Sequence, residues 1–434
     1  MTHTYRLAPL AAGLLLASQA ALAAEARPGS LPPAPEFETH SEVQIIPRDR
    51  LYTFRALEQY QEPEWVTELV EQGMIPPLEE RLPPEPLVFE EAGMPDGIGV
   101  YGGALRHVIG GRPQGWNWAA GQTQGWGGIS YTVAECLTRT GPLFMLPPED
   151  QEPLPNLARS WEWSEDGRQL TMQLIEGARW SDGHPFTSED VLFYWEDNVL
   201  DPNVATFASP GTFGEGTTLE ALDEATIRWT FAEPASAQVL FQMAFFQFCP
   251  GPAHVLKPHH PRYNDANSYD DYVNALPVAD LPIPSMGAWV PTEYRSDELV
   301  LMRRNPYYWK VDSAGNQLPY ADEMLFRLTT WSDRTVQTVA GSADVSNMEN
   351  PANYVGALQR SQSEDAPARL EFGPRTVGWT LNLNMAEELG ADDDRQRAIR
   401  QLNRDLRFRQ ALSHAIDRRA LGQSLVRGPF THAF

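Results

Sequence analysis

The sequence predicts an α/β protein, because segments with strand periodicity and segments with helix periodicity follow one another along most of the chain. Asn156–Leu174 holds two runs of alternating apolar residues around Asp166-Gly167, a dipeptide that tolerates the positive φ of a hairpin turn. Thr187 then precedes a stretch, Val191–Val199, in which apolar residues recur every four positions, as on one buried helix face. Thr187 is expected to cap this helix.

The first 23 residues predict a secretory signal peptide. Arg6 precedes an apolar run, and Ala21-Leu22-Ala23 supplies the small residues that a signal peptidase accepts, so cleavage is expected before Ala24. A lipoprotein would carry a cysteine at that point, but the only two cysteines are Cys136 and Cys249. We therefore expect a mature protein that diffuses freely in the periplasm.

Residues 24–97 form a Pro-rich and acidic extension with little periodicity. One helix is predicted across Glu64–Gln72, and the rest is expected to wrap over a surface. Ala104–Gly111 predicts the first strand of a globular lobe.

Three later runs predict strands, and one predicts a helix. Ala221–Phe231 alternates apolar and polar residues, and Glu298–Trp309 reads as a strand that stops at Asn305-Pro306. Val377–Met385 also alternates. A helix is predicted to begin near Asp405, where apolar residues recur at helical spacing.

Composition and motifs exclude several classes of function. The chain has 33 basic and 58 acidic residues, a net charge of −25, so no general cationic field attracts nucleic acid. It contains no HExxH, no GxSxG and no phosphate-binding loop, so we expect neither an enzyme nor a cofactor. The histidines His254, His259 and His260 could ligate a metal, but their Pro-rich context favours a surface turn.

The two cysteines allow one intramolecular pairing. An oxidising compartment permits a disulfide between Cys136 and Cys249. Both lie in apolar surroundings, where buried free thiols are also common. The sequence leaves both alternatives open.

Two segments carry candidate ligand-binding residues. The Gly-rich stretch 111–128 is rich in indoles and amides, which suit stacking and hydrogen bonding to a ligand, although the same indoles could close a core. The run Val377–Met385 places amides on its polar face, toward either solvent or a cleft. The candidates are Trp116, Asn117, Trp118, Trp126, Trp379, Asn382 and Asn384.

The run Leu154–Asp197, with its WSDGHPFTSEDVLFYWED core, resembles the family 5 solute-binding proteins, the extracellular receptors of oligopeptide, dipeptide and nickel ABC importers. The resemblance continues from about Gly97 onward, through DPN, LDEATIRWTF, LVLMRRNPYYWKVDSAGNQLPYADEMLFRL and RFRQALSHAIDRRAL. The stretches LVEQGMIPPLEERLPPEPLVF and GNQLPYAD are similar to a branch of larger members with an N-terminal extension.

The resemblance implies a type II periplasmic binding fold, with two lobes and an extra subdomain on the first lobe. The implied boundaries are 1–23 for the signal peptide, 24–97 for the extension, 98–130 and 215–345 for lobe I, 131–214 for the extra subdomain and 346–434 for a partial lobe II. The resemblance also implies that the chain crosses into the second lobe near Gly341–Val345. Because few residues follow this crossing, we expect an incomplete second lobe and a fragment that is poorly soluble alone.

The function implied is that of the periplasmic binding component of an ABC importer. It would capture a peptide-like or oligosaccharide-like solute in an interlobe cleft and dock on a membrane permease, without catalysis and without nucleic acid. The alternatives left open are a secreted hydrolase with an unrecognised site and a chaperone-like periplasmic binding protein.

Overall fold

A computed structural model gives the structure of the chain. It describes residues 45–94, 96–109, 111–125, 128–141, 145–147, 149–330, 333–346, 353–362, 381–388, 390–417 and 420. The predicted signal peptide lies outside these residues. Two compact units share the rest: a larger one built around residues 45–346 and a smaller one that holds residues 381–388 and 390–417.

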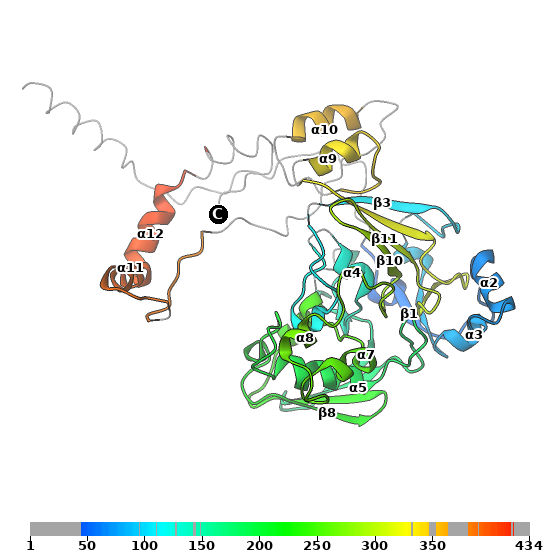
Figure 1. Cartoon of the computed structure of the whole chain (residues 1–434), viewed down its shortest axis with the longest axis horizontal. Coiled ribbons are helices and arrows are strands. Elements are labelled where there is room, and N and C mark those ends of the chain that lie inside the picture. Colours follow the sequence, from blue (N-terminus) through cyan, green and yellow to red (C-terminus); the bar gives the residue numbers. More distant parts are fainter. Residues whose placement is uncertain are drawn as a thin grey trace, which may run out of the picture. The chain divides into compact units, whose positions relative to one another are not determined.

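The first sheet of the larger unit has the order β10-β11-β13-β3. Neighbours β10, β11 and β13 are antiparallel, whereas β3 lies parallel to β13. The predicted first strand is confirmed as β3, and the strand before Asn305-Pro306 as β11 (Figure 1). The bounds are β3 Ala104–Ile109, β10 Trp289–Arg295, β11 Leu299–Arg304 and β13 Glu323–Leu328.

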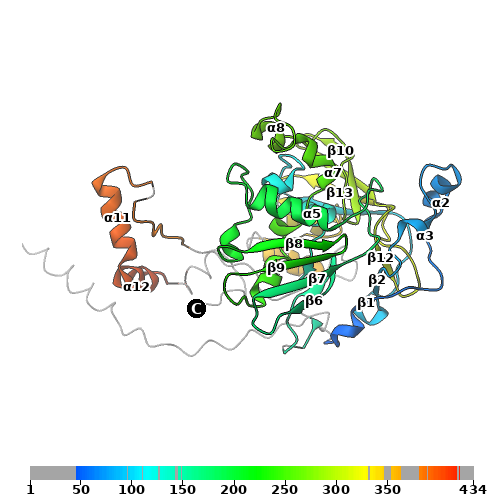
Figure 2. The same cartoon turned by 90° about the horizontal axis from the view of Figure 1, so that it is seen from below.

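A second four-stranded sheet, of order β6-β7-β9-β8, is antiparallel throughout. Figure 2 shows it with helix α5 (Ser188–Phe193) beside it. The predicted hairpin is confirmed as β6 and β7, and Gly167 in its turn has a φ of 66°, which costs glycine little. The bounds are β6 Ala158–Trp163, β7 Gln169–Leu174, β8 Thr218–Asp223 and β9 Thr226–Thr230.

Helix α5 begins as the sequence predicts. The Thr187 side chain accepts a hydrogen bond from the N–H of Glu189, and the Asp190 carboxylate accepts one from the N–H of Thr187. Asp190 also accepts from the N–H of Ala253, the first residue of α7 (Ala253–Leu256). One buried carboxylate therefore joins two helix starts, where negative charge is favourable.

Removing this cap gives a first testable prediction. Thr187→Ala is expected to lower the free energy of unfolding by about 1 kcal/mol, because the N–H of Glu189 loses its acceptor. Thr187→Ser keeps the hydroxyl and should stay within a few tenths of a kcal/mol of the parent. Urea unfolding of the three proteins measures this, and equal losses for the alanine and serine variants would contradict it.

The buried stripe of α5 continues through the π-helix η6 (Tyr194–Val199). Val191, Trp195 and Val199 are all buried, which confirms the predicted inner face. The Trp195 and Trp229 rings meet edge to face with centroids 4.9 Å apart. The Trp of this helix therefore packs in the core.

The extension contributes to the fold more than the sequence indicates. Its strands β1 (Tyr52–Phe54) and β2 (Leu87–Phe89) pair with each other, and β2 lies parallel to β12 (Lys310–Asp312). The helix predicted across Glu64–Gln72 is confirmed as α2 (Glu64–Glu71). The expectation of a mere wrap fails because three-residue strands show too little periodicity to be recognised.

The other elements are short or belong to the chain's later part. The predicted strand Val377–Met385 lies partly outside the described residues, and its described part, 381–385, is not in a strand. The helix near Asp405 is confirmed as α12, with Asp405 as its N-cap. The bounds are α3 Leu78–Arg81, α4 Ile129–Val133, β4 Thr138–Arg139, β5 Leu154–Pro155, α6 Gln238–Gln242, α8 Tyr269–Val273, α9 Asp333–Val339, α10 Tyr354–Ser361, α11 Asp394–Arg404 and α12 Leu406–Ala415.

Candidate ligand-binding site

The carboxyl ends of β3 and β13 lie side by side, with Ile109 opposite Leu328. Ligands of α/β proteins bind beyond the carboxyl ends of such parallel strands. The Gly-rich stretch 111–125 starts at this edge. Its Arg112 donates from Nε to Asp297 at 2.8 Å and from Nη1 to the carbonyl of Thr329 at 3.0 Å. The stretch is thus anchored where β13 ends.

The structure buries three of the predicted ligand residues. The indole N–H of Trp116 donates to the carbonyl of Val278 at 3.2 Å, and that of Trp118 donates to the carbonyl of Cys249 at 3.2 Å. The Asn117 amide donates to a backbone carbonyl of α8 at 2.7 Å. These contacts favour the core alternative that the sequence left open, and the ligand role of Trp116, Asn117 and Trp118 stays a prediction.

The remaining candidates stay predictions as well. Trp126 and Trp379 lie outside the described residues. Asn382 and Asn384 are exposed and belong to the smaller unit, where Asn384 accepts from the N–H of Ala386 at 3.0 Å. That bond is a local turn contact and does not depend on a ligand.

A cluster that the sequence analysis missed lies where α4 meets the chain after α6. Tyr131 of α4 is 62% exposed and Phe245 is 48% exposed, although both are large aromatics. The rings of Tyr131 and Phe246 meet edge to face, with centroids 6.2 Å apart. We call Tyr131, Phe245 and Phe246 the aromatic patch. The run Met243–Phe248 (MAFFQF) was the available signal, but exposure decides whether such a run is core or surface.

Of the two alternatives left open for the cysteines, a disulfide or two free thiols, the structure has the disulfide. Cys136 and Cys249 are joined, with Cα atoms 4.1 Å apart. Cys136 follows α4, and Cys249 follows the 3-10 helix η8 (Phe246–Phe248), so the bond links the two sides of the aromatic patch. The Thr138 hydroxyl reinforces this link by donating to the carbonyl of Leu240 at 2.6 Å.

The segments that carry the patch have no charged side chain. Neither Pro113–Ala134 nor Pro234–Ala253 contains Asp, Glu, Lys, Arg or His, in a chain of which 21% is charged. The disulfide brings these neutral segments together. A charged ligand group would find no charge partner on either segment, and burying an unpaired charge is costly. These two segments therefore offer no charged side chain to a ligand.

An ion pair between Arg106 and Asp344 attaches the chain after α9 to strand β3. The Arg106 guanidinium lies 2.6 Å from Asp344, whose carboxylate also accepts from the backbone N–H of Arg106 at 2.7 Å. Hydrogen bonding to Arg106 lowers the pKa of Asp344 below its ordinary value. His107 and Val345 then form a parallel bridge. Residues 344 and 345 thus lie along the edge of β3, and the crossing into a second lobe expected near Gly341–Val345 stays a prediction.

His254 and His260 have different partners. His254 pairs with Asp182 at 2.8 Å, while His260 is fully buried and lies 3.0 Å from the carbonyl of Asp197. Among the described residues, no group of three or more His, Cys, Asp or Glu side chains could hold a metal ion. The predicted surface turn is wrong for His254, which lies in α7, and for His260, which is fully buried because it packs between Asp197 and the rings of Phe193 and Tyr272.

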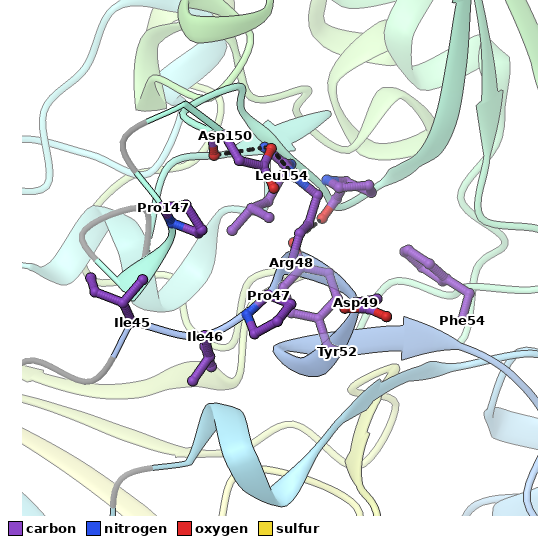
Figure 3. A pocket seen from close by; sticks show the side chains of 11 residues that line it. Ile45, Ile46, Pro47, Arg48, Asp49, Tyr52, Phe54, Pro147, Asp150 and Leu154 are labelled. Carbon is purple, nitrogen blue, oxygen red and sulfur yellow. Dashed lines mark hydrogen bonds and ion pairs between the residues drawn. The ribbon is translucent and has the colours of Figure 1, made fainter.

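A hollow of about 670 Å³ opens beside the N-terminal segment (Figure 3). Its polar side chains include Arg48, whose guanidinium contacts Asp150 at 2.9 Å and the carbonyl of Glu152 at 2.6 Å. These groups bind one another across the hollow. It lies between residues 45–54 and 147–155, and its lining shares no residue with the aromatic patch.

Comparisons with known proteins place the chain among binding proteins. The sequence model of a protein family, described as bacterial extracellular solute-binding proteins, family 5 middle, matches residues 152–433. A periplasmic alpha-galactoside-binding protein of Rhizobium meliloti is 54% identical over 433 residues, which is 99% of this chain and 62% of that protein. The chain therefore spans less than two thirds of that relative's length.

Solved structures of binding proteins are also similar to this chain. The periplasmic binding protein MelB of Agrobacterium fabrum C58, in complex with stachyose, is 54% identical with a TM-score of 0.88, over 94% of this chain and 61% of that one. An oligopeptide-binding protein OppA is 29% identical with a TM-score of 0.61, over 86% and 58% of the two chains. No helix among the described residues is long and apolar enough to cross a membrane.

Proposed function

The chain belongs to the bacterial extracellular solute-binding proteins of family 5, and from this premise we propose that it captures an uncharged oligosaccharide for an ABC importer. The solute binds between two lobes and is delivered to a permease in the inner membrane. Membership confirms the type II binding fold and the location outside the cytoplasm that the sequence predicts. The relatives are named as binding proteins, in keeping with the expectation that the chain is no enzyme.

One observation carries the proposed ligand class: the 54% identity, over nearly the whole chain, to proteins whose names specify an alpha-galactoside and stachyose. Of the two classes expected from the sequence, this favours the oligosaccharide over the peptide. The neutral segments 113–134 and 234–253 support the same choice, since a peptide brings charged termini that need partners when they are desolvated.

Thermal unfolding with added sugar tests this proposal. Stachyose at a hundred times its dissociation constant should stabilise the folded chain by about 2.7 kcal/mol. A tripeptide at the same concentration should leave the melting temperature unchanged. Calorimetric titration then gives the affinity. A shift with the tripeptide and none with stachyose would overturn the proposed ligand class.

A further inference from the structure

We propose that the aromatic patch of Tyr131, Phe245 and Phe246 is a subsite on which a sugar ring of the bound oligosaccharide stacks. This inference rests on the proposed function and adds to it the residues that recognise the sugar. The ligand chemistry is an uncharged pyranose, whose apolar C–H face packs on an aromatic plane while its hydroxyls bind amides and water.

The exposure of the patch needs an explanation. Tyr131 and Phe245 are both well exposed to solvent, whereas Trp116, Trp180, Trp195 and Trp309 are fully buried. Single exposed apolar residues are ordinary, whereas contiguous exposed apolar surface is a feature of binding sites. The edge-to-face contact of Tyr131 with Phe246 joins these two rings, and Phe245 is the neighbour of Phe246 in the chain.

The patch is also held rigidly. Cys136 lies five residues after Tyr131, and Cys249 lies three residues after Phe246, so the disulfide fixes both ring-bearing segments. The buried Trp118 adds a hydrogen bond to the carbonyl of Cys249. A ligand that meets rings already in place does not have to order them, and this preorganisation increases affinity.

The helix that carries Tyr131 packs on the first sheet. Helix α4, which carries Tyr131, follows the Gly-rich stretch that starts at the carboxyl end of β3. The Thr132 hydroxyl lies 3.1 Å from the sulfur of Met302 on β11, so α4 packs on the first sheet. Gln242 and Gln247 lie close to Phe245 and Phe246 in the sequence, are partly exposed, and carry amides of the kind that bind sugar hydroxyls.

Affinity measurements on ring deletions test the proposal. Tyr131→Ala and Phe245→Ala should each weaken stachyose binding at least 10-fold in calorimetric titrations, because each removes an exposed stacking surface. Tyr131→Phe keeps the ring and should bind within about 3-fold of the parent. Leu222→Ala removes an exposed apolar side chain of β8 and serves as the matched control, with no expected change. Melting temperatures show that each variant is folded.

The outcomes separate the two proposals. If the parent chain binds stachyose and both ring deletions bind it within 2-fold, the patch is no subsite and the proposed function still stands. If the parent binds no alpha-galactoside, the proposed function fails, and the subsite fails with it. If sedimentation shows a dimer that Tyr131→Ala converts to a monomer, a second copy of the chain covers the patch and the inference is overturned.

Discussion

Glu135→Gln is expected to lower the free energy of unfolding by about 3–5 kcal/mol, because it leaves the buried ammonium of Lys310 without its charge partner. Lys310 Nζ lies 2.8 Å and 2.9 Å from the two carboxylate oxygens of Glu135, and the Lys310 side chain is 3% exposed. Glu135 also accepts from the Tyr308 hydroxyl and the Asn156 amide. Urea unfolding of parent and variant measures the loss.

A double variant separates the lost charge pair from lost packing. Glu135→Gln with Lys310→Met removes both charges and keeps one side-chain oxygen as an acceptor near Tyr308 and Asn156, so most of the loss should be recovered. Glu220→Gln breaks an exposed pair with Arg228 and should cost less than about 1 kcal/mol. Equal losses for Glu135→Gln and Glu220→Gln would contradict the prediction.

The same pair predicts a pH dependence of stability. Burial lowers the pKa of Lys310 to about 8, although Glu135 opposes the shift, whereas an unfolded lysine titrates near about 10.4. Between these values the unfolded state binds more protons, so the contribution of Lys310 to stability rises with pH. The parent should therefore gain stability relative to the double variant between pH 7 and pH 9.5. A constant difference across that range would count against it.

Local signals in the sequence predict the elements whose structure depends on neighbouring residues. Asp166-Gly167 predicts the β6–β7 turn because only a few residues tolerate its backbone, and Thr187 predicts the start of α5 because a cap acts within one turn. Asn305-Pro306 ends β11 for a similar reason, since proline cannot donate in a sheet ladder. These predictions need no knowledge of the rest of the chain.

The candidate site depends on distant contacts, and the sequence predicts it less well. Trp118 and Tyr131 are both large aromatics near the same glycines, yet one is buried and the other exposed. What decides is the partner across the fold: Cys249 lies 131 positions after Trp118 and accepts its N–H. Residue type fixes what a side chain can do, and only tertiary packing fixes which surface it faces.

Replacing both cysteines, Cys136→Ala with Cys249→Ala, is expected to cost about 2–5 kcal/mol of unfolding free energy. The bond closes a loop of 113 positions, and the chain-entropy estimate for such a loop is about 5 kcal/mol. Cys136→Ala alone breaks the same bond and should lose a similar amount. Reduction of the parent chain gives an independent check. A double variant within about 1 kcal/mol of the parent would contradict the prediction.

The same variant distinguishes a bond that only stabilises the fold from one that also prepares the aromatic patch. A purely stabilising bond changes the population of folded molecules, so below the variant's melting range its removal leaves the affinity for stachyose unchanged. A bond that holds the rings of Tyr131 and Phe246 in place lowers the ordering cost of binding, so its removal weakens affinity even when every molecule is folded. We expect the second result, measured by calorimetric titration of the folded variant. Unchanged affinity there would mean that α4 and η8 keep the patch in place without the covalent link.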